Sequence, residues 1–150
     1  MSENVVICVD ASEQAADAFA WYVNHIHRAG NNIFLLHAPE IESLAMSSAG
    51  SMSFSPGVWQ NLYQKENAAS KQLEHDYSQR LKEAGLPGKW VTVNHGGKPA
   101  EAIVKAAQEV EATLLVMGTR GMGTVRRTIF GSVSDYVLHH AHCPVAVYRH

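Results

Sequence analysis

The chain has 150 residues, of which 46% are hydrophobic and 17% charged, and its formal net charge is −2 at pH 7. This length suits one ordinary domain, and the composition is that of a folded globule rather than a disordered chain. A slightly acidic chain lacks the positive charge by which nucleic-acid binders hold phosphates, and no apolar run approaches the ~20 residues of a membrane span. We therefore expect one domain that binds neither nucleic acid nor a membrane.

The start of the chain and its cysteines bear on where the protein works. A strand pattern begins almost at once, with no basic stretch or cleavage signal before it, which argues against secretion. The sequence has two cysteines, too few for a disulfide framework. Cys8 lies within an apolar run, where a small core residue is expected. The sequence therefore predicts a reducing, cytoplasmic setting.

Short apolar runs rich in β-branched residues predict strands, because continuous rather than alternating hydrophobicity is typical of parallel strands covered on both faces. The runs are residues 5–9, 33–37, 90–94, 114–117 and 145–148. Helical patterns lie between them, over residues 12–28, 56–84, 99–110 and 131–142. This alternation predicts one α/β domain, doubly wound, with helices on both faces of a parallel sheet.

The predicted helices carry recognisable start and packing signals. Ser12 suits the N-cap of the first helix, and Pro99 suits the first turn of the third. The second helix is long, and apolar residues at helical spacing predict one packed face along it. These residues are Val58, Leu62, Ala69, Leu73, Tyr77 and Leu81.

A glycine-rich segment follows the fourth predicted strand. Gly118, Gly121, Gly131 and Ser132 stand in the spacing G-x2-G-x9-G-S. Glycine permits positive φ and close approach of a ligand, and the N–H groups of such a turn and of a helix N-terminus favour an anion. The spacing fits neither a P-loop, which needs a lysine before Ser132, nor the dinucleotide fingerprint. It predicts a phosphate-binding turn, and a tight turn that binds nothing is the alternative.

These residues also carry a family resemblance. Segments 118–121 and 131–134, with Cys-Pro-Val-Ala-Val at 143–147, resemble the C-terminal signature of the universal stress protein family. The segments 9–13 and 98–103 resemble other parts of that family. The resemblance covers essentially the whole chain, and the glycine spacing is similar to that of the nucleotide-binding branch. It implies one nucleotide-binding domain over residues 1–150, with a five-stranded sheet in the order 3-2-1-4-5.

The same resemblance implies an ATP site, with or without Mg²⁺, where the strand order reverses between the first and fourth strands. The residues it implies are Asp10, Ala38, Met117, Gly118, Gly121, Arg127, Gly131, Ser132, Val133 and Ser134. The glycine backbone and Ser132 would hold the triphosphate, and Val133 and Ser134 would extend the contact into a helix. Arg127 would pair with phosphate oxygens, unless it is simply solvated.

The remaining three residues would lie at the adenosine end. Asp10 would accept from a ribose hydroxyl or position a metal ion, and its alternative is an acidic residue favoured at a helix N-terminus. Ala38 stands where the family often has valine, and would contact adenine through its backbone. Met117 would form an apolar wall, unless it is a core residue.

The resemblance implies an ATP-binding universal stress protein that acts as a dimeric, nucleotide-dependent switch in the stress response. The last strand, at an edge of the sheet, is the expected homodimer contact. No catalytic residue and no metal site are predicted, although slow ATP hydrolysis near Asp10 stays open. One alternative is a partner-binding dimer with a vestigial pocket, in which the Ser- and Met-rich segment 43–55 acts as a flap or a disordered insertion. Another is an active phosphohydrolase.

Overall fold

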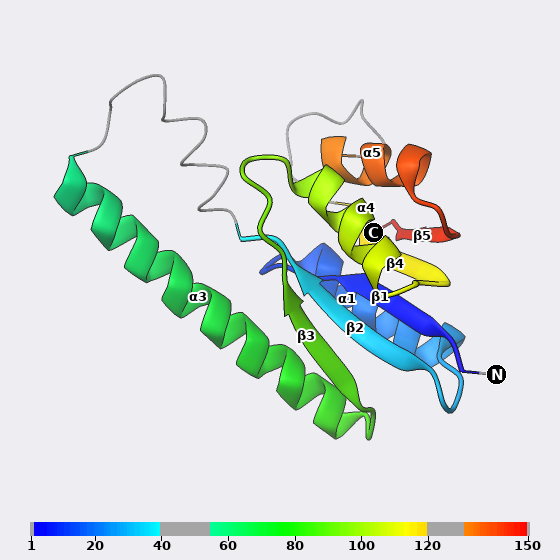
Figure 1. Cartoon of the computed structure of the whole chain (residues 1–150). Coiled ribbons are helices and arrows are strands. Elements are labelled where there is room, and N and C mark those ends of the chain that lie inside the picture. The colour runs from blue at the N-terminus through cyan, green and yellow to red at the C-terminus, as the bar shows by residue number, and fades with distance from the viewer. Residues whose placement is uncertain (1, 40–54, 120–130, 150) are drawn as a thin grey trace.

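The computed structural model describes residues 2–39, 55–119 and 131–149. Within these ranges five strands form one parallel sheet in the order β3-β2-β1-β4-β5 (Figure 1). The strands are β1 (Asn4–Cys8), β2 (Asn32–His37), β3 (Gly88–Thr92), β4 (Leu114–Gly118) and β5 (Val145–Tyr148). The order and the parallel pairing confirm the doubly wound α/β fold expected from the sequence.

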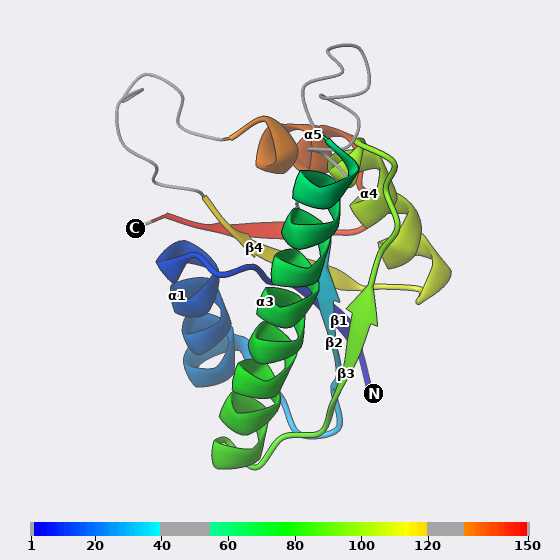
Figure 2. The same ribbon diagram turned by 90° about the vertical axis from the view of Figure 1, so that its left-hand side faces the viewer.

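Helices cover both faces of this sheet. They are α1 (Glu13–Trp21), which continues as the π-helix η1 (Tyr22–Ile26), then α3 (Pro56–Glu83), α4 (Pro99–Glu109) and α5 (Ser132–His140). In Figure 2 the sheet is seen with α1 and α3 on one side, and α4 and α5 on the other. None of the helices in the described ranges is long and apolar enough to cross a membrane.

Alternate strand residues point to opposite faces, so the core has two layers. On the α1 and α3 side, Val5 and Ile7 pack with Phe19. On the α4 and α5 side, Val6 and Leu115 pack with residues of both helices. All five of these side chains are at most 4% exposed. The sheet is therefore packed on both faces, and its strand ends are held between the two layers.

The third strand begins and ends two residues before its predicted bounds of 90–94. Its pairing with β2 runs from Ile33 opposite Gly88 to His37 opposite Thr92. Gly88 and Lys89 lack the apolar, β-branched character that marks a strand in the sequence. The partner strand, and not the composition of the segment, therefore sets these bounds.

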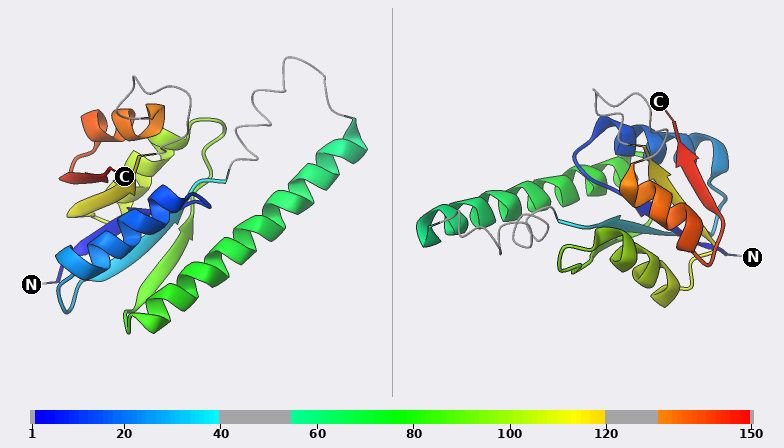
Figure 3. Two further views of the ribbon diagram at one scale, coloured as in Figure 1. Left: turned by 180° about the vertical axis from the view of Figure 1, so that it is seen from behind. Right: turned by 90° about the horizontal axis from the view of Figure 1, so that it is seen from above.

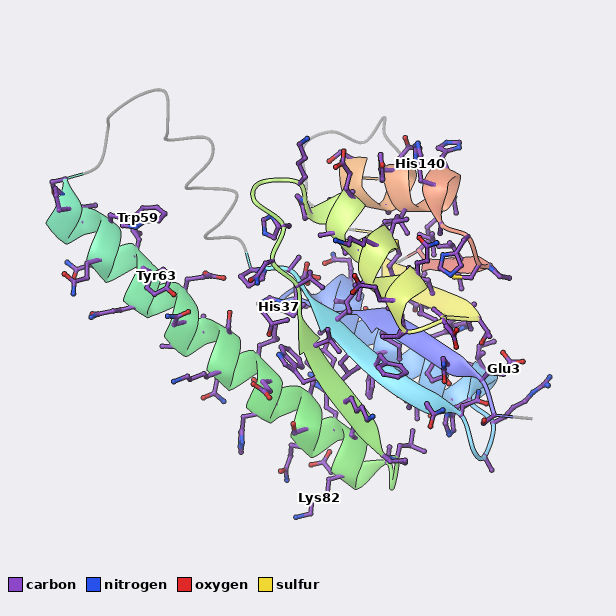
Figure 4. All side chains as sticks on the ribbon, in the orientation of Figure 1. Glu3, His37, Trp59, Tyr63, Lys82 and His140 are labelled. Carbon is purple, nitrogen blue, oxygen red and sulfur yellow. The ribbon has the colours of Figure 1, made fainter. Side chains whose placement is uncertain are left out.

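The prediction that α3 packs along its whole length was wrong. Tyr77 and Leu81, in its C-terminal half, are 2% and 7% exposed, whereas Val58 near its start is 46% exposed. Figure 4 shows Trp59 and Tyr63 on the part of the helix that extends beyond the sheet, and the two views of Figure 3 show the same extension. Helical spacing identified the stripe, but it does not tell how far the sheet reaches beneath it.

Candidate functional site

The carboxyl ends of the central strands meet at one edge of the sheet. Ile7 on β1 pairs with Val116 on β4, so Asp10 and Gly118 leave the sheet at nearly the same level. On the other side of β1, strand β2 ends at His37, and Ala38 leaves at the same edge. The strand order reverses between β1 and β4, which is where doubly wound sheets bind ligands.

Asp10 forms the turn from β1 into α1. Its Oδ1 accepts a hydrogen bond from the Ser12 backbone N–H at 2.8 Å, and the Ser12 hydroxyl also donates to it. The Ser12 Oγ in turn accepts from the Ala15 N–H at 3.2 Å and caps the helix, as predicted. One carboxylate oxygen of Asp10 is thus engaged with the cap of α1, as the helix-terminal alternative expects.

Cys8, two residues before Asp10, is partly buried against the core layer that faces α4 and α5. Burial, with a further contribution from the charge of Asp10, raises the pKa of Cys8 to about 12. A thiol with such a pKa is protonated at neutral pH, and the thiolate is the reactive form. The raised pKa thus disfavours the reactive thiolate of Cys8 at neutral pH.

Gly118 is fixed by close packing against α1. A Cβ at this position would lie 2.5 Å from the Gln14 carbonyl oxygen and 3.1 Å from the Ala15 nitrogen, both backbone atoms. Among the described glycines, those with left-handed φ are Gly30, Gly85, Gly96 and Gly97. Gly118 is needed for the approach of two chain segments rather than for an unusual φ. The sequence analysis did not predict this close packing of Gly118 against α1.

The end of β4 is also tied to β5. The Thr119 N–H donates to the Tyr148 carbonyl oxygen at 3.0 Å, and Thr119 is 8% exposed. Met117, two residues earlier, is 4% exposed and packs in the layer that faces α4 and α5. The structure thus places the Met117 side chain in the core, which was the alternative to an apolar wall.

Helix α5 begins on the carboxyl-edge side of the sheet (Figure 1). Gly131 is its N-cap with φ −67° and ψ 163°, and no side chain within the described ranges caps the helix. A Cβ on Gly131 would meet Ser134 Oγ at 3.8 Å, an ordinary contact. Ser132 is exposed and Val133 half-buried, while the Ser134 hydroxyl donates to the Gly131 carbonyl oxygen at 3.1 Å. Among residues 2–39, 55–119 and 131–149, no side chain accepts from the first N–H groups of α5.

Two of the ten predicted site residues, Gly121 and Arg127, lie outside the described residues. The same holds for residues 43–54 of the segment expected to form a flap. The described part places Asp10, Ala38 and Gly118 at one edge, and the start of α5 on the same side of the sheet. The roles of all ten residues stay predictions.

Two buried histidines at this edge were missed in the sequence. His37 is 5% exposed, and its ring bonds to β1 and α3. His95 is 8% exposed; its Nε2 donates to the Pro39 carbonyl oxygen at 2.6 Å, and its Nδ1 accepts from the Gly97 N–H at 3.0 Å. The one available signal was a histidine at the end of each of two apolar strand runs. It does not reveal the partners, which come from distant segments.

These features define a class of α/β fold, a doubly wound parallel sheet with helices on both faces and a strand-order reversal between β1 and β4. The sequence model of the universal stress protein family matches residues 1–149, and the chain belongs to that family. It is 31% identical to universal stress protein PHOS34 of Arabidopsis thaliana over 96% of this chain. It is 29% identical to PHOS32 of the same plant, again over 96% of this chain. The chain spans 60% of the length of PHOS34 and 63% of that of PHOS32.

Solved structures share the fold. The universal stress protein UspA from Lactobacillus plantarum superposes with a TM-score of 0.73 and 26% identity, over 98% of this chain and 97% of that one. A universal stress family protein from Arabidopsis thaliana, solved with AMP bound, gives 0.71 and 24% over 98% and 91%. A universal stress protein in complex with cAMP gives 0.68 and 24% over 97% and 96%. Proteins of this fold thus include some that hold adenine nucleotides.

Proposed function

We propose that residues 1–150 form a nucleotide-binding domain that holds ATP or a related adenine nucleotide, with or without Mg²⁺, at the carboxyl edge of the sheet. One observation carries the proposal: on the carboxyl-edge side of the sheet, where Asp10 and Gly118 leave it, α5 starts without a side-chain cap from any described residue. Ser12 caps α1 and Ser55 caps α3, whereas α4, like α5, begins without a side-chain cap in the described residues. In α4, Pro99 stands in the first turn and removes one N–H group there. A helix start without a side-chain acceptor favours a phosphate.

At the phosphate end, the backbone N–H groups of Ser132, Val133 and Ser134 are the proposed donors. The Ser132 hydroxyl is exposed and adds another donor. Because the Ser134 hydroxyl already donates to Gly131, we assign Ser134 a backbone contact alone. The glycines at 118, 121 and 131 and the guanidinium of Arg127 complete the proposed phosphate site.

At the adenosine end, Asp10 accepts from a ribose hydroxyl in this proposal, while its Oδ1 stays bonded to Ser12. Ala38 contacts adenine through its backbone. The Met117 side chain packs in the core layer, so in this proposal it shapes the site from the interior of the protein. The AMP and cAMP in structures of relatives support adenine as the base.

We further propose a homodimer through β5. This strand pairs with β4 on one side, and its residues Val145, Ala146, Val147 and Tyr148 are half-buried in the single chain. An apolar edge strand of this kind is a template for pairing with a second copy. Such a dimer would act as a cytoplasmic nucleotide-dependent switch in the stress response, with at most slow ATP hydrolysis.

A second candidate function is a partner-binding dimer whose nucleotide pocket is vestigial. The observation in its favour is the packing of Gly118, which accounts for that glycine without any ligand. Calorimetric titration of nucleotide-stripped protein with ATP, AMP and cAMP separates the two. A dissociation constant of about 10 μM or below, roughly −7 kcal/mol, supports the nucleotide site. Absence of heat with all three nucleotides, at two temperatures, contradicts it.

A further inference from the structure

His37 joins the candidate site to the long helix α3. It is the last residue of β2 and is 5% exposed (Figure 4). Its Nδ1 lies 3.0 Å from the Val9 carbonyl oxygen, and its Nε2 lies 3.2 Å from Ser70 Oγ on α3. A carbonyl oxygen only accepts, so Nδ1 carries a proton, and in the neutral ring Nε2 accepts from the Ser70 hydroxyl.

The bond to Val9 fixes the residue that immediately precedes Asp10. Backbone pairing of β1 with β2 ends at Cys8 opposite Leu36. Val9 then donates its N–H to the Leu36 carbonyl oxygen at 2.9 Å, while its own carbonyl accepts from the His37 ring. The ring continues the hydrogen-bond ladder by one residue. Asp10 therefore follows a residue whose backbone N–H and carbonyl oxygen are both hydrogen-bonded.

The bond to Ser70 lies where α3 changes from packed to extended. Towards its C-terminus, Leu73 is half-buried and Tyr77 is buried against the sheet. Towards its N-terminus the helix passes beyond the edge of the sheet. The His37 ring also lies 5.6 Å from the Trp90 ring, which lies 6.5 Å from that of Tyr77. His37 thus contacts Val9, which precedes Asp10 of the candidate site, and also Ser70 on α3.

We propose that His37 is a positioning residue for the nucleotide site and that, through Ser70, it couples nucleotide binding to the docking of α3. The inference rests on the proposed nucleotide function. Asp10 follows Val9, and Ala38 follows His37. A nucleotide held by Asp10 and Ala38 therefore fixes the chain next to both partners of the His37–Val9 bond, and so favours the ring position that bonds Ser70. Coupling is reciprocal: the factor by which the Ser70 bond tightens nucleotide binding is the factor by which nucleotide tightens α3 docking.

Three variants separate the two bonds. Ser70→Ala removes the bond to α3 alone. His37→Phe removes both bonds and keeps the ring size. His37→Asn places an amide N–H near the position of Nδ1 and retains donation to Val9 without reaching Ser70. Ser78→Ala, an exposed serine on the same helix, is the matched control.

The experiment combines ATP–Mg²⁺ titration with hydrogen exchange of the α3 amides. In the wild type, ATP slows exchange around Ser70; in Ser70→Ala that slowing is lost and affinity falls about fivefold, while Ser78→Ala matches the wild type. His37→Phe loses more affinity than Ser70→Ala, and His37→Asn recovers the difference between them.

Failure of this inference is distinguishable from failure of the proposed function. If the wild type binds ATP and Ser70→Ala shows the same affinity and the same ATP-dependent slowing, the coupling is overturned and the nucleotide site stands. If His37→Phe binds ATP as the wild type does, the positioning role is overturned. If the wild type binds no nucleotide, the proposed function and the coupling fall together.

Discussion

The backbone of Gln14 approaches Gly118 so closely that a methyl group on Gly118 would lie 2.5 Å from the Gln14 carbonyl oxygen. Gln14 is in the first turn of α1, and Gly118 is the last residue of β4. The contact joins the turn that carries Asp10 to the strand that leads into the glycine segment. It therefore positions the two sides of the candidate site relative to each other.

Replacement of Gly118 by alanine should destabilise the fold. The atoms that a Cβ would meet are backbone atoms, which cannot rotate away, so α1 or β4 must shift. We expect a loss of about 1–3 kcal/mol in the free energy of unfolding, measured with urea. Gly57→Ala is the control, since a Cβ there has nothing within 4 Å. A Gly118→Ala protein as stable as the wild type would contradict the close approach.

Loss of the Ser12 hydroxyl should weaken α1 and alter Asp10 together. Ser12→Ala removes the cap on the Ala15 N–H and the hydrogen bond from the Ser12 hydroxyl to Asp10. A loss of about 1 kcal/mol is expected from the cap. Ser55→Ala removes the corresponding cap from the extended end of α3. It should lower the free energy of unfolding by less, because the first turn of α3 packs against little of the rest of the fold. Equal losses in the two variants would argue against this difference in packing.

Stability should fall at alkaline pH. Burial raises the pKa of Cys8 from 9.0 to about 12 and that of Tyr77 from 10.0 to about 12. Both groups are neutral when protonated. Between the ordinary pKa and the raised pKa of each group, the folded state therefore binds more protons than the unfolded state. The contribution of these two groups to the free energy of unfolding is therefore constant below about pH 9, and it is lost as the pH rises towards 12. Urea midpoints from pH 7 to 11 measure this slope, and Cys8→Ala should reduce it.

Tyr77→Phe tests the same region at neutral pH. The Tyr77 hydroxyl is buried and has no hydrogen-bond partner among the described residues. Removal of an unsatisfied buried hydroxyl is neutral or stabilising, and the ring keeps its edge-on contact with Phe19 at 5.4 Å. We expect no loss of stability at pH 7 and a smaller alkaline slope. A loss above about 1 kcal/mol at pH 7 would indicate a partner for the hydroxyl.

The dimer proposal has its own test at β5. Leu115 and Thr119 donate their N–H groups to the carbonyl oxygens of Pro144 and Tyr148. Backbone groups alternate in direction along a strand, so the N–H of Val147 points away from β4. Val147→Pro removes that outward donor and should convert a dimer into a monomer in sedimentation experiments, with the fold retained. A monomeric wild type, or a variant that stays dimeric, would rule out pairing through this edge.

The hydrophobic pattern predicted much of the fold, because each strand contains an apolar run and Ser12 and Pro99 mark helix starts. The strand order came from the family resemblance, since local sequence does not encode which strands pair. Three features needed the folded chain: the approach of Gln14 to Gly118, the bonds of His37 and the extended half of α3. Each depends on contacts between segments that are distant in sequence.

The most direct test of the nucleotide site is calorimetric titration of ATP–Mg²⁺ into the wild type and Gly131→Val. A Cβ at Gly131 would meet no atom of the described residues closer than 3.8 Å, so we expect the fold to be retained. The same side chain would stand at the start of α5, where the phosphates are proposed to bind. We expect micromolar binding by the wild type and a loss of at least about 100-fold, roughly 2.7 kcal/mol, in the variant. Unchanged affinity in a folded Gly131→Val protein would contradict this site.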